Sequence, residues 1–101
     1  MRIEYSARGL ADVGWLVDFL VETYPQAAQS TAALIVEAVD LLRRHPMIGR
    51  SRPGGLRELV ISRGRSGCVA LYQVDIVRDR ILVLAIRHQR ERGFAPQGSA
   101  D

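Results

Sequence analysis

The apolar run from Ile81 to Ile86 constrains the fold more than any other segment of the chain. It is unbroken and three of its residues are β-branched, which is typical of a strand buried in a sheet. Arg87, His88, Arg90 and Arg92 follow at its end. Guanidinium groups bind carboxylates and phosphates through two donors at once. The segment therefore predicts a buried strand that ends in a cationic cluster, suited to a phosphate backbone, an acidic protein surface or an acidic peptide.

Length and composition indicate one globular domain. The chain has 101 residues, and a hydrophobic content of 48% is enough for a single core. No apolar run approaches the roughly eighteen residues that cross a bilayer, and Glu4, Asp12 and Asp18 argue against an N-terminal secretory signal. Cys68 is the only cysteine, so no internal disulfide can form. We expect a cytoplasmic protein with no membrane contact and no metal site.

Charge is distributed unevenly along the chain. Residues 1–42 hold two arginines and six acids, a net charge of −4, whereas residues 43–92 hold twelve arginines and four acids, a net charge of +8. All 14 basic residues are arginine, which codon bias alone could produce. The asymmetry favours an acidic or nucleic-acid partner for the C-terminal half. The alternative is a solvated surface of scattered charge.

Turn and capping signals divide the chain into two helices and four strands. Ser6 is a suitable N-cap for the first helix, Pro25 suits the first turn of the second, and Arg43, Arg44 and His45 suit its C-terminal end. The Gly- and Pro-rich residues 46–55 are predicted to be a loop. The predicted strands span residues 2–5, 56–62, 68–75 and 80–87. We expect residues 1–94 to form one domain and residues 95–101 to be a disordered tail.

Hydrophobic periodicity predicts which faces are buried. Helical spacing gives each helix one apolar face, made of Leu10, Val13, Val17, Leu20, Val21 and Tyr24 in the first and Thr31, Leu34, Ile35, Ala38, Leu41 and Leu42 in the second. Leu84 is expected in the core, and Tyr72 is more typical of a core aromatic than of a base-stacking platform. The element order β-α-α-β-β-β predicts an α+β fold, in which a helical hairpin packs on a small, mainly antiparallel sheet.

Several short segments, in the same order, resemble the RelE/ParE toxin superfamily. In the first half they are Asp12-Val13, Leu16, Phe19-Leu20, Pro25 to Ala28, His45-Pro46 and Gly49-Arg50. In the second half they are Leu56 to Leu59, Val69 to Tyr72, and Ile81 through Glu91. The ending Ile-Arg-His-Gln-Arg-Glu is most similar to the ParE branch.

This resemblance implies the toxin of a bacterial type II toxin–antitoxin pair. ParE-like members act on DNA gyrase, whereas RelE-like members cut mRNA in the ribosome. Both are neutralised by a cognate antitoxin, here ParD-like or similar, which also makes the main contacts of the complex with operator DNA. No cofactor is implied.

The cationic cluster is the predicted target-binding site, with Arg87, His88, Arg90 and Arg57 as its residues. A ribonuclease would instead need an acid–base pair and phosphate-binding cations, for which His88, Arg87, Glu58 and Arg57 are the candidates. The resemblance makes catalysis the second choice, because the ribonuclease branch relies on lysines or a C-terminal tyrosine. This chain has no lysine, and Gln89 follows His88.

The predicted antitoxin-binding residues are an aromatic residue and four arginines: Trp15, Arg50, Arg52, Arg63 and Arg65. Trp15 and Phe19 are i, i+4 neighbours on the helix, away from its main apolar face. An aromatic pair in that position favours an interface anchor. The alternative is that the second helix or the loop covers the pair, and that the loop arginines only carry solvated charge.

Overall fold

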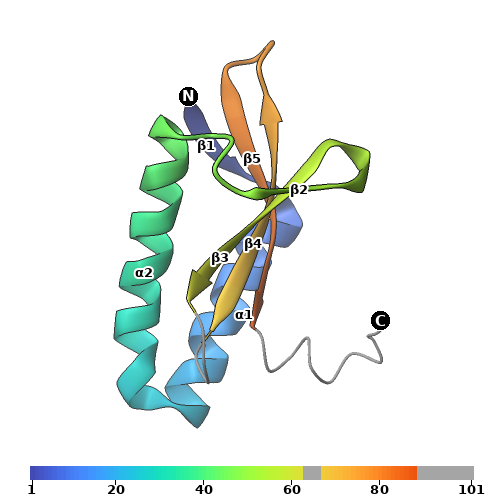
Figure 1. Cartoon of the computed structure of the whole chain (residues 1–101). Helices are drawn as coiled ribbons and strands as arrows, with labels where there is room; N and C mark the ends of the chain where they lie inside the picture. The colour runs from blue at the N-terminus through green and yellow to red at the C-terminus, as the bar shows by residue number, and fades with distance from the viewer. Residues whose placement is uncertain (63–66, 89–101) are drawn as a thin grey trace.

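The computed structural model describes residues 1–62 and 67–88 (Figure 1). Its elements are β1 (Arg2–Tyr5), α1 (Ala7–Thr23), α2 (Pro25–Arg44), β2 (Arg50–Arg52), a 3-10 turn (Pro53–Gly55), β3 (Leu56–Ser62), β4 (Cys68–Asp75) and β5 (Arg80–His88). The predicted α+β order is confirmed. The proposed tail at 95–101 lies outside the described residues.

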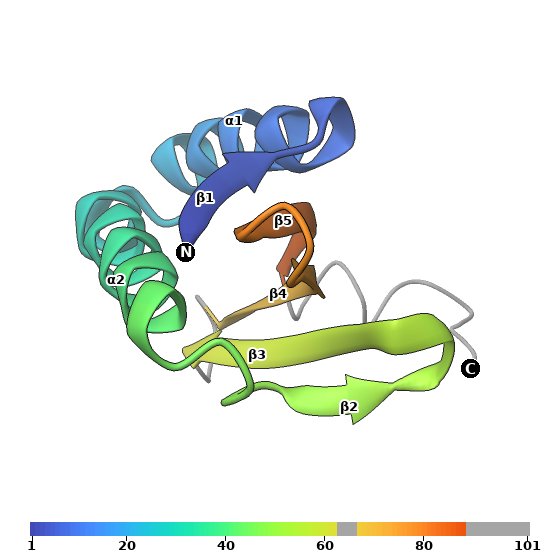
Figure 2. The same cartoon turned by 90° about the horizontal axis from the view of Figure 1, so that it is seen from above.

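The five strands form one sheet in the order β1-β5-β4-β3-β2. Strand β1 runs parallel to β5, and every other neighbouring pair is antiparallel, so the mainly antiparallel sheet is confirmed. Figure 2 shows a strongly twisted sheet, with α1 beside β1 and β5 and with α2 along one side. Helix α1 packs chiefly on β5, and α2 contacts β3. The helical hairpin therefore covers one face of the sheet.

Strand β2 lies within the segment that the sequence predicts to be a loop. Its three residues are exposed and carry no alternating pattern, so nothing in them marks a strand. The turn between β2 and β3 depends on Gly54 and Gly55, whose φ angles are 82° and 75°. Glycine adopts this conformation without steric cost. The turn brings Arg50 opposite Glu58 and closes an antiparallel hairpin.

Local sequence signals place the helix ends correctly. The Ser6 hydroxyl accepts a hydrogen bond from the Gly9 amide at 2.9 Å, which caps α1. Pro25 begins α2, where its missing N–H costs nothing. Arg43 and Arg44 occupy the last turn of α2. Positive charge there suits the helix dipole.

The buried face of α1 is rotated from the predicted one. Leu16 and Leu20 are buried, whereas Leu10 and Val21 are exposed. The close approach of Gly9 to β5 explains the rotation, because a Cβ at Gly9 would collide with the Val83 carbonyl oxygen. In α2 the predicted face is confirmed in part. Thr31, Ile35 and Leu42 are buried together with Ala28 and Val39, whereas Leu34 is exposed.

The prediction that Leu84 lies in the core is wrong. The register between β4 and β5 shifts so that Leu71 pairs with Ala85 and Tyr72 pairs with Val83. Leu84 is the extra residue of this β-bulge, and it is only half-buried. The bulge reverses the alternation of side chains, so that Val83 and Ile86 both face the helices and join one core cluster.

Candidate functional site

The structure separates the two described members of the predicted strand-end cluster. Neighbouring residues of a strand face opposite sides of the sheet. Arg87 pairs with Val69, and His88 pairs with Cys68. Cys68 belongs to the core cluster, so His88 lies on the helix-covered face, where it is 1% exposed. Arg87 lies on the opposite face.

The structure describes only some of the other predicted cations. Arg50, Arg52 and Arg57 lie in β2 and β3, whereas Arg63, Arg65 and Arg90 lie outside the described residues. Because Arg87 and His88 face opposite sides of the sheet, β5 does not present both side chains to one ligand. The histidine faces the helices, whereas the arginine faces away from them and is half-buried.

An aromatic series connects buried His88 to the surface. The Phe19 ring lies 5.2 Å from the His88 ring at a tilt of 58°. On its other side Phe19 stacks on Trp15, with ring centroids 5.0 Å apart and planes only 9° apart. Trp15 is 47% exposed. The predicted exposed ridge on α1 is therefore present at Trp15, while Phe19 is partly buried against the core.

Glu58 lies between the two arginines of β2. One of its carboxylate oxygens accepts from Arg50 at 2.9 Å and from Arg52 at 3.3 Å. The carboxylate side chain is mostly buried beneath these exposed guanidinium groups. The β2–β3 hairpin thus joins a candidate catalytic acid to two candidate antitoxin-binding arginines. The contacts give Glu58 a clear role in holding β2 on the sheet.

Arg57 and Tyr72 fasten the loop before β2. Arg57 donates to the carbonyl oxygens of Met47 at 3.2 Å and Gly49 at 2.8 Å. The Tyr72 hydroxyl donates to the Pro46 carbonyl at 2.8 Å and accepts from the Gly49 amide at 2.8 Å. Burial raises the pKa of Tyr72. Tyr72 was correctly predicted to be a core residue, but its hydrogen bonds depend on a loop 26 residues earlier in the chain.

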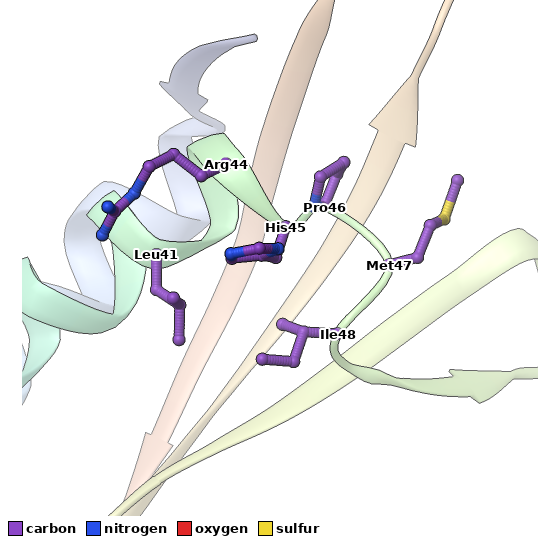
Figure 3. Close-up of a pocket in the computed structure, with 6 residues that line it drawn as sticks. All are labelled: Leu41, Arg44, His45, Pro46, Met47 and Ile48. Atoms are coloured by element: carbon purple, nitrogen blue, oxygen red, sulfur yellow. The ribbon is translucent and has the colours of Figure 1, made fainter.

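An open hollow lies where α2 meets this loop. It is lined by Leu41, Arg44, His45, Pro46, Met47 and Ile48, and its volume is about 620 Å³. Figure 3 shows Leu41 of α2 and Ile48 of the loop on one side of the His45 ring. Its lining is mainly apolar. The sequence does not reveal the hollow, because residues 45–48 carry only the signals of a helix end and a loop, and the hollow forms where they fold back against Leu41.

Alternating charges join the edge strand β1 to its neighbours β5 and β4, on the side of the sheet opposite β2. Arg80 donates to Glu4 at 2.7 Å and to Asp75 at 3.4 Å, and Arg78 donates to Asp75 at 3.0 Å. The hydrogen bond from Arg80 lowers the pKa of Glu4, and the hydrogen bond from the Arg78 amide lowers that of Asp75. These ion pairs connect β1 to the β4–β5 hairpin.

The described residues contain neither a metal-binding cluster nor a membrane span. Across residues 1–62 and 67–88, no three histidine, cysteine or acidic side chains gather to hold a metal ion. In the same part of the chain, no helix is long and apolar enough to cross a membrane.

Comparison with protein families then identifies the chain. Residues 3–93 match the family described as the ParE toxin of the type II toxin–antitoxin system parDE. The chain belongs to the ParE toxin family. The resemblance seen in the short ordered segments is therefore confirmed, and it extends over nearly the whole chain.

Two relatives place this ParE-family toxin within the wider superfamily. Toxin RelE3 of Caulobacter vibrioides is 32% identical over 90 residues, which cover 89% of this chain and 96% of the relative. A solved structure described as the chromosomal ParDE TA system from P. aeruginosa matches with a TM-score of 0.70 and 26% identity. The match covers 87% of this chain and 95% of the other. Together they support the fold and the toxin class.

Proposed function

We propose that this toxin inhibits bacterial growth by binding and poisoning DNA gyrase, and that a cognate ParD-like antitoxin neutralises it. Membership of the ParE family supports the toxin class and the antitoxin partner. The observation that carries the binding mechanism is the position of His88. Its imidazole is 1% exposed and packs against Phe19, where it cannot reach a substrate hydroxyl without local opening.

The other groups that a ribonuclease would use are also held in structural contacts. Arg57 donates to two loop carbonyls, and Glu58 accepts from Arg50 and Arg52. General acid–base catalysis needs a group within hydrogen-bond reach of the proton that moves. These contacts favour a toxin that acts through its surface shape and charge rather than by proton transfer.

The proposed target surface is the end of β5, with Arg87 as its outward-facing cation and Arg90 following it in the sequence. In this proposal His88 supports the strand end from inside, and Arg57 contributes by fixing the loop at 46–49. The proposed antitoxin surface includes Trp15 and the exposed Arg50 and Arg52. Arg63 and Arg65 belong to the same proposal from sequence alone. Acidic antitoxin side chains would pair with these arginines.

The second candidate is a RelE-like, ribosome-dependent mRNA endoribonuclease. It is favoured by the name of the relative Toxin RelE3, which is 32% identical to this chain. In that case His88, Arg87, Glu58 and Arg57 would form the catalytic set, and the end of β5 would have to rearrange to expose His88.

Two assays of the purified toxin separate these functions. Gyrase supercoiling should fail in the presence of the toxin and recover when antitoxin is added, while a cell-free translation reaction should keep its mRNA intact. Gyrase should keep its supercoiling activity when the Arg87→Gln variant of the toxin replaces the wild type. Arg43→Gln is the matched control, because Arg43 is an exposed arginine of α2 in a loose pair with Asp40. Intact supercoiling together with ribosome-dependent mRNA cleavage would replace the first function with the second.

A further inference from the structure

One end of the molecule carries an apolar projection beside an apolar hollow. Figure 1 shows the C-terminal end of α2, the N-terminus and the β4–β5 turn together at the top, and Figure 2 shows them at the same end from above. Ile76 and Val77 form the turn and are 71% and 92% exposed. The hollow beside the end of α2 exposes Met47 and Ile48. Soluble monomers rarely expose apolar side chains that lie together, and such a patch commonly marks an interaction site.

Backbone and side-chain contacts hold the turn in one conformation. The Asp75 carboxylate accepts from the Arg78 amide at 3.1 Å, and the Asp79 amide donates to the Ile76 carbonyl at 3.2 Å. The Arg2 amide in turn donates to the Asp79 carbonyl at 3.0 Å, which joins the turn to β1. The exposed side chain of Val77 therefore sits on a supported turn. Because the turn is already ordered, binding through it costs little conformational entropy in the turn.

The charged groups at the base of the turn largely neutralise one another. Arg80 contacts both Glu4 and Asp75, and Arg78 also contacts Asp75. This balance argues against a nucleic-acid partner, which would need an excess of positive charge. Asp79 adds an acidic side chain beside Val77, and its exposed position leaves it open to a cation on a partner.

We propose that two copies of this chain associate through this end, with Ile76 and Val77 of each copy entering the hollow of the other. A two-fold interface needs complementary features on a single surface, and here the projection and the hollow share one end of the molecule. Charge complementarity also favours a second copy of this chain. Arg44 lines the hollow and is exposed, and its pair with Asp40 is long at 4.0 Å, so its guanidinium group can also receive Asp79 of the second copy. This self-association goes beyond gyrase binding and antitoxin neutralisation.

The contact is small, so the dimer should be weak. Stable protein interfaces bury about 1,600 Å² in total, and smaller contacts give weak complexes. We expect wild-type toxin to shift from monomer to dimer between roughly 1 µM and 1 mM in sedimentation equilibrium. Val77→Asp should abolish the shift, because it would place a carboxylate in the apolar hollow. Val36→Asp is the matched control, since Val36 is 68% exposed on α2 and lies outside the proposed contact.

Cross-linking tests the pairing itself. A Val77→Cys chain mixed with a Met47→Cys chain should form a disulfide-linked dimer under mild oxidation, and neither variant alone should do so. Cys68 is fully buried and does not compete. Asp79→Asn keeps a residue that tolerates the local φ of 53° and removes the charge. It should weaken the dimer, and Arg44→Gln should add little to that loss if the two side chains pair.

Three results would overturn the proposal. Wild-type toxin could remain monomeric throughout the concentration range. Val36→Asp could disrupt the dimer as strongly as Val77→Asp. Val77→Asp could leave the dimer unchanged while it weakens antitoxin binding, which would assign this end of the molecule to the antitoxin.

Discussion

The hydroxyl of Tyr72 occupies the space that a side chain at Gly49 would need. A Cβ built at Gly49 would lie 2.6 Å from that hydroxyl oxygen and 2.7 Å from the Cε1 atom of the ring. The same hydroxyl accepts the Gly49 amide hydrogen bond. Together with the hydrogen bonds from Arg57, this contact holds the loop that joins α2 to β2, which forms one wall of the hollow.

Gly49→Ala should destabilise the toxin by about 1–3 kcal/mol, because the added methyl group forces the buried Tyr72 ring or the loop to move. Gly14→Ala is the matched control: Gly14 lies in α1, and no atom approaches its Cβ position within 4 Å. That change should stabilise the helix by up to about 1 kcal/mol. Urea unfolding measures both free energies. Equal effects of the two substitutions would contradict the close packing of Tyr72 against Gly49.

Two residues of β5, Ile86 and Leu84, should differ sharply in their contribution to stability. Ile86→Ala removes a buried side chain from the core cluster and should cost about 2–5 kcal/mol. Leu84→Ala, at the bulge, should cost distinctly less, because Leu84 is half-buried. The comparison uses the same unfolding measurement. A larger loss of stability for Leu84→Ala than for Ile86→Ala would contradict the bulge at Leu84.

The ion pairs around Arg80 should make stability depend on acidic pH. The pKa of Glu4 is lowered from 4.5 and that of Asp75 from 3.8, so both carboxylates stabilise the fold when ionised. This contribution is present above their unfolded pKa values and is lost as the pH falls through the lower folded values. Arg80→Gln should therefore lower the unfolding midpoint near pH 7, with a smaller difference from wild type near pH 2. A constant difference between wild type and variant across that range would rule out the ion pairs as its cause.

Trp15 should anchor the antitoxin. Its ring is half-exposed and rests flat on Phe19, so it presents a rigid apolar surface. Trp15→Ala should weaken antitoxin binding by about 2 kcal/mol, measured by calorimetry, while the fold persists. Val36→Ala provides a control at another exposed apolar residue of the helical hairpin. If Trp15→Ala binds the antitoxin as tightly as wild type, Trp15 is a surface residue that only covers Phe19.

Sequence alone predicts the elements of this fold better than it predicts their faces. Ser6, Pro25 and the arginines at the end of α2 act locally, so their capping roles can be inferred from neighbouring residues. The bulge at Leu84 cannot be inferred from neighbouring residues, because an unbroken apolar run has no alternation that would reveal a change of face. The rotation of α1 depends on the contact between Gly9 and Val83, which are far apart in the sequence.

The candidate site shows the same limit. Alternation along a strand predicts that Arg87 and His88 face opposite ways, but not which of them faces the helices. That choice follows from the bulge and from the position of Phe19 on α1. Arg50 and Arg52 could be placed in an exposed segment from the sequence, whereas their common partner Glu58 required the pairing of β2 with β3.

The central claim is that the toxin acts by binding gyrase. A titration of purified toxin into a fixed amount of gyrase, with supercoiling as the signal, tests it most directly. A binding toxin should inhibit in proportion to the gyrase sites that it occupies, and added antitoxin should reverse the inhibition. Two results together would contradict this mechanism: supercoiling that is unchanged at a large excess of toxin, and mRNA cleavage at a toxin concentration far below that of the ribosomes.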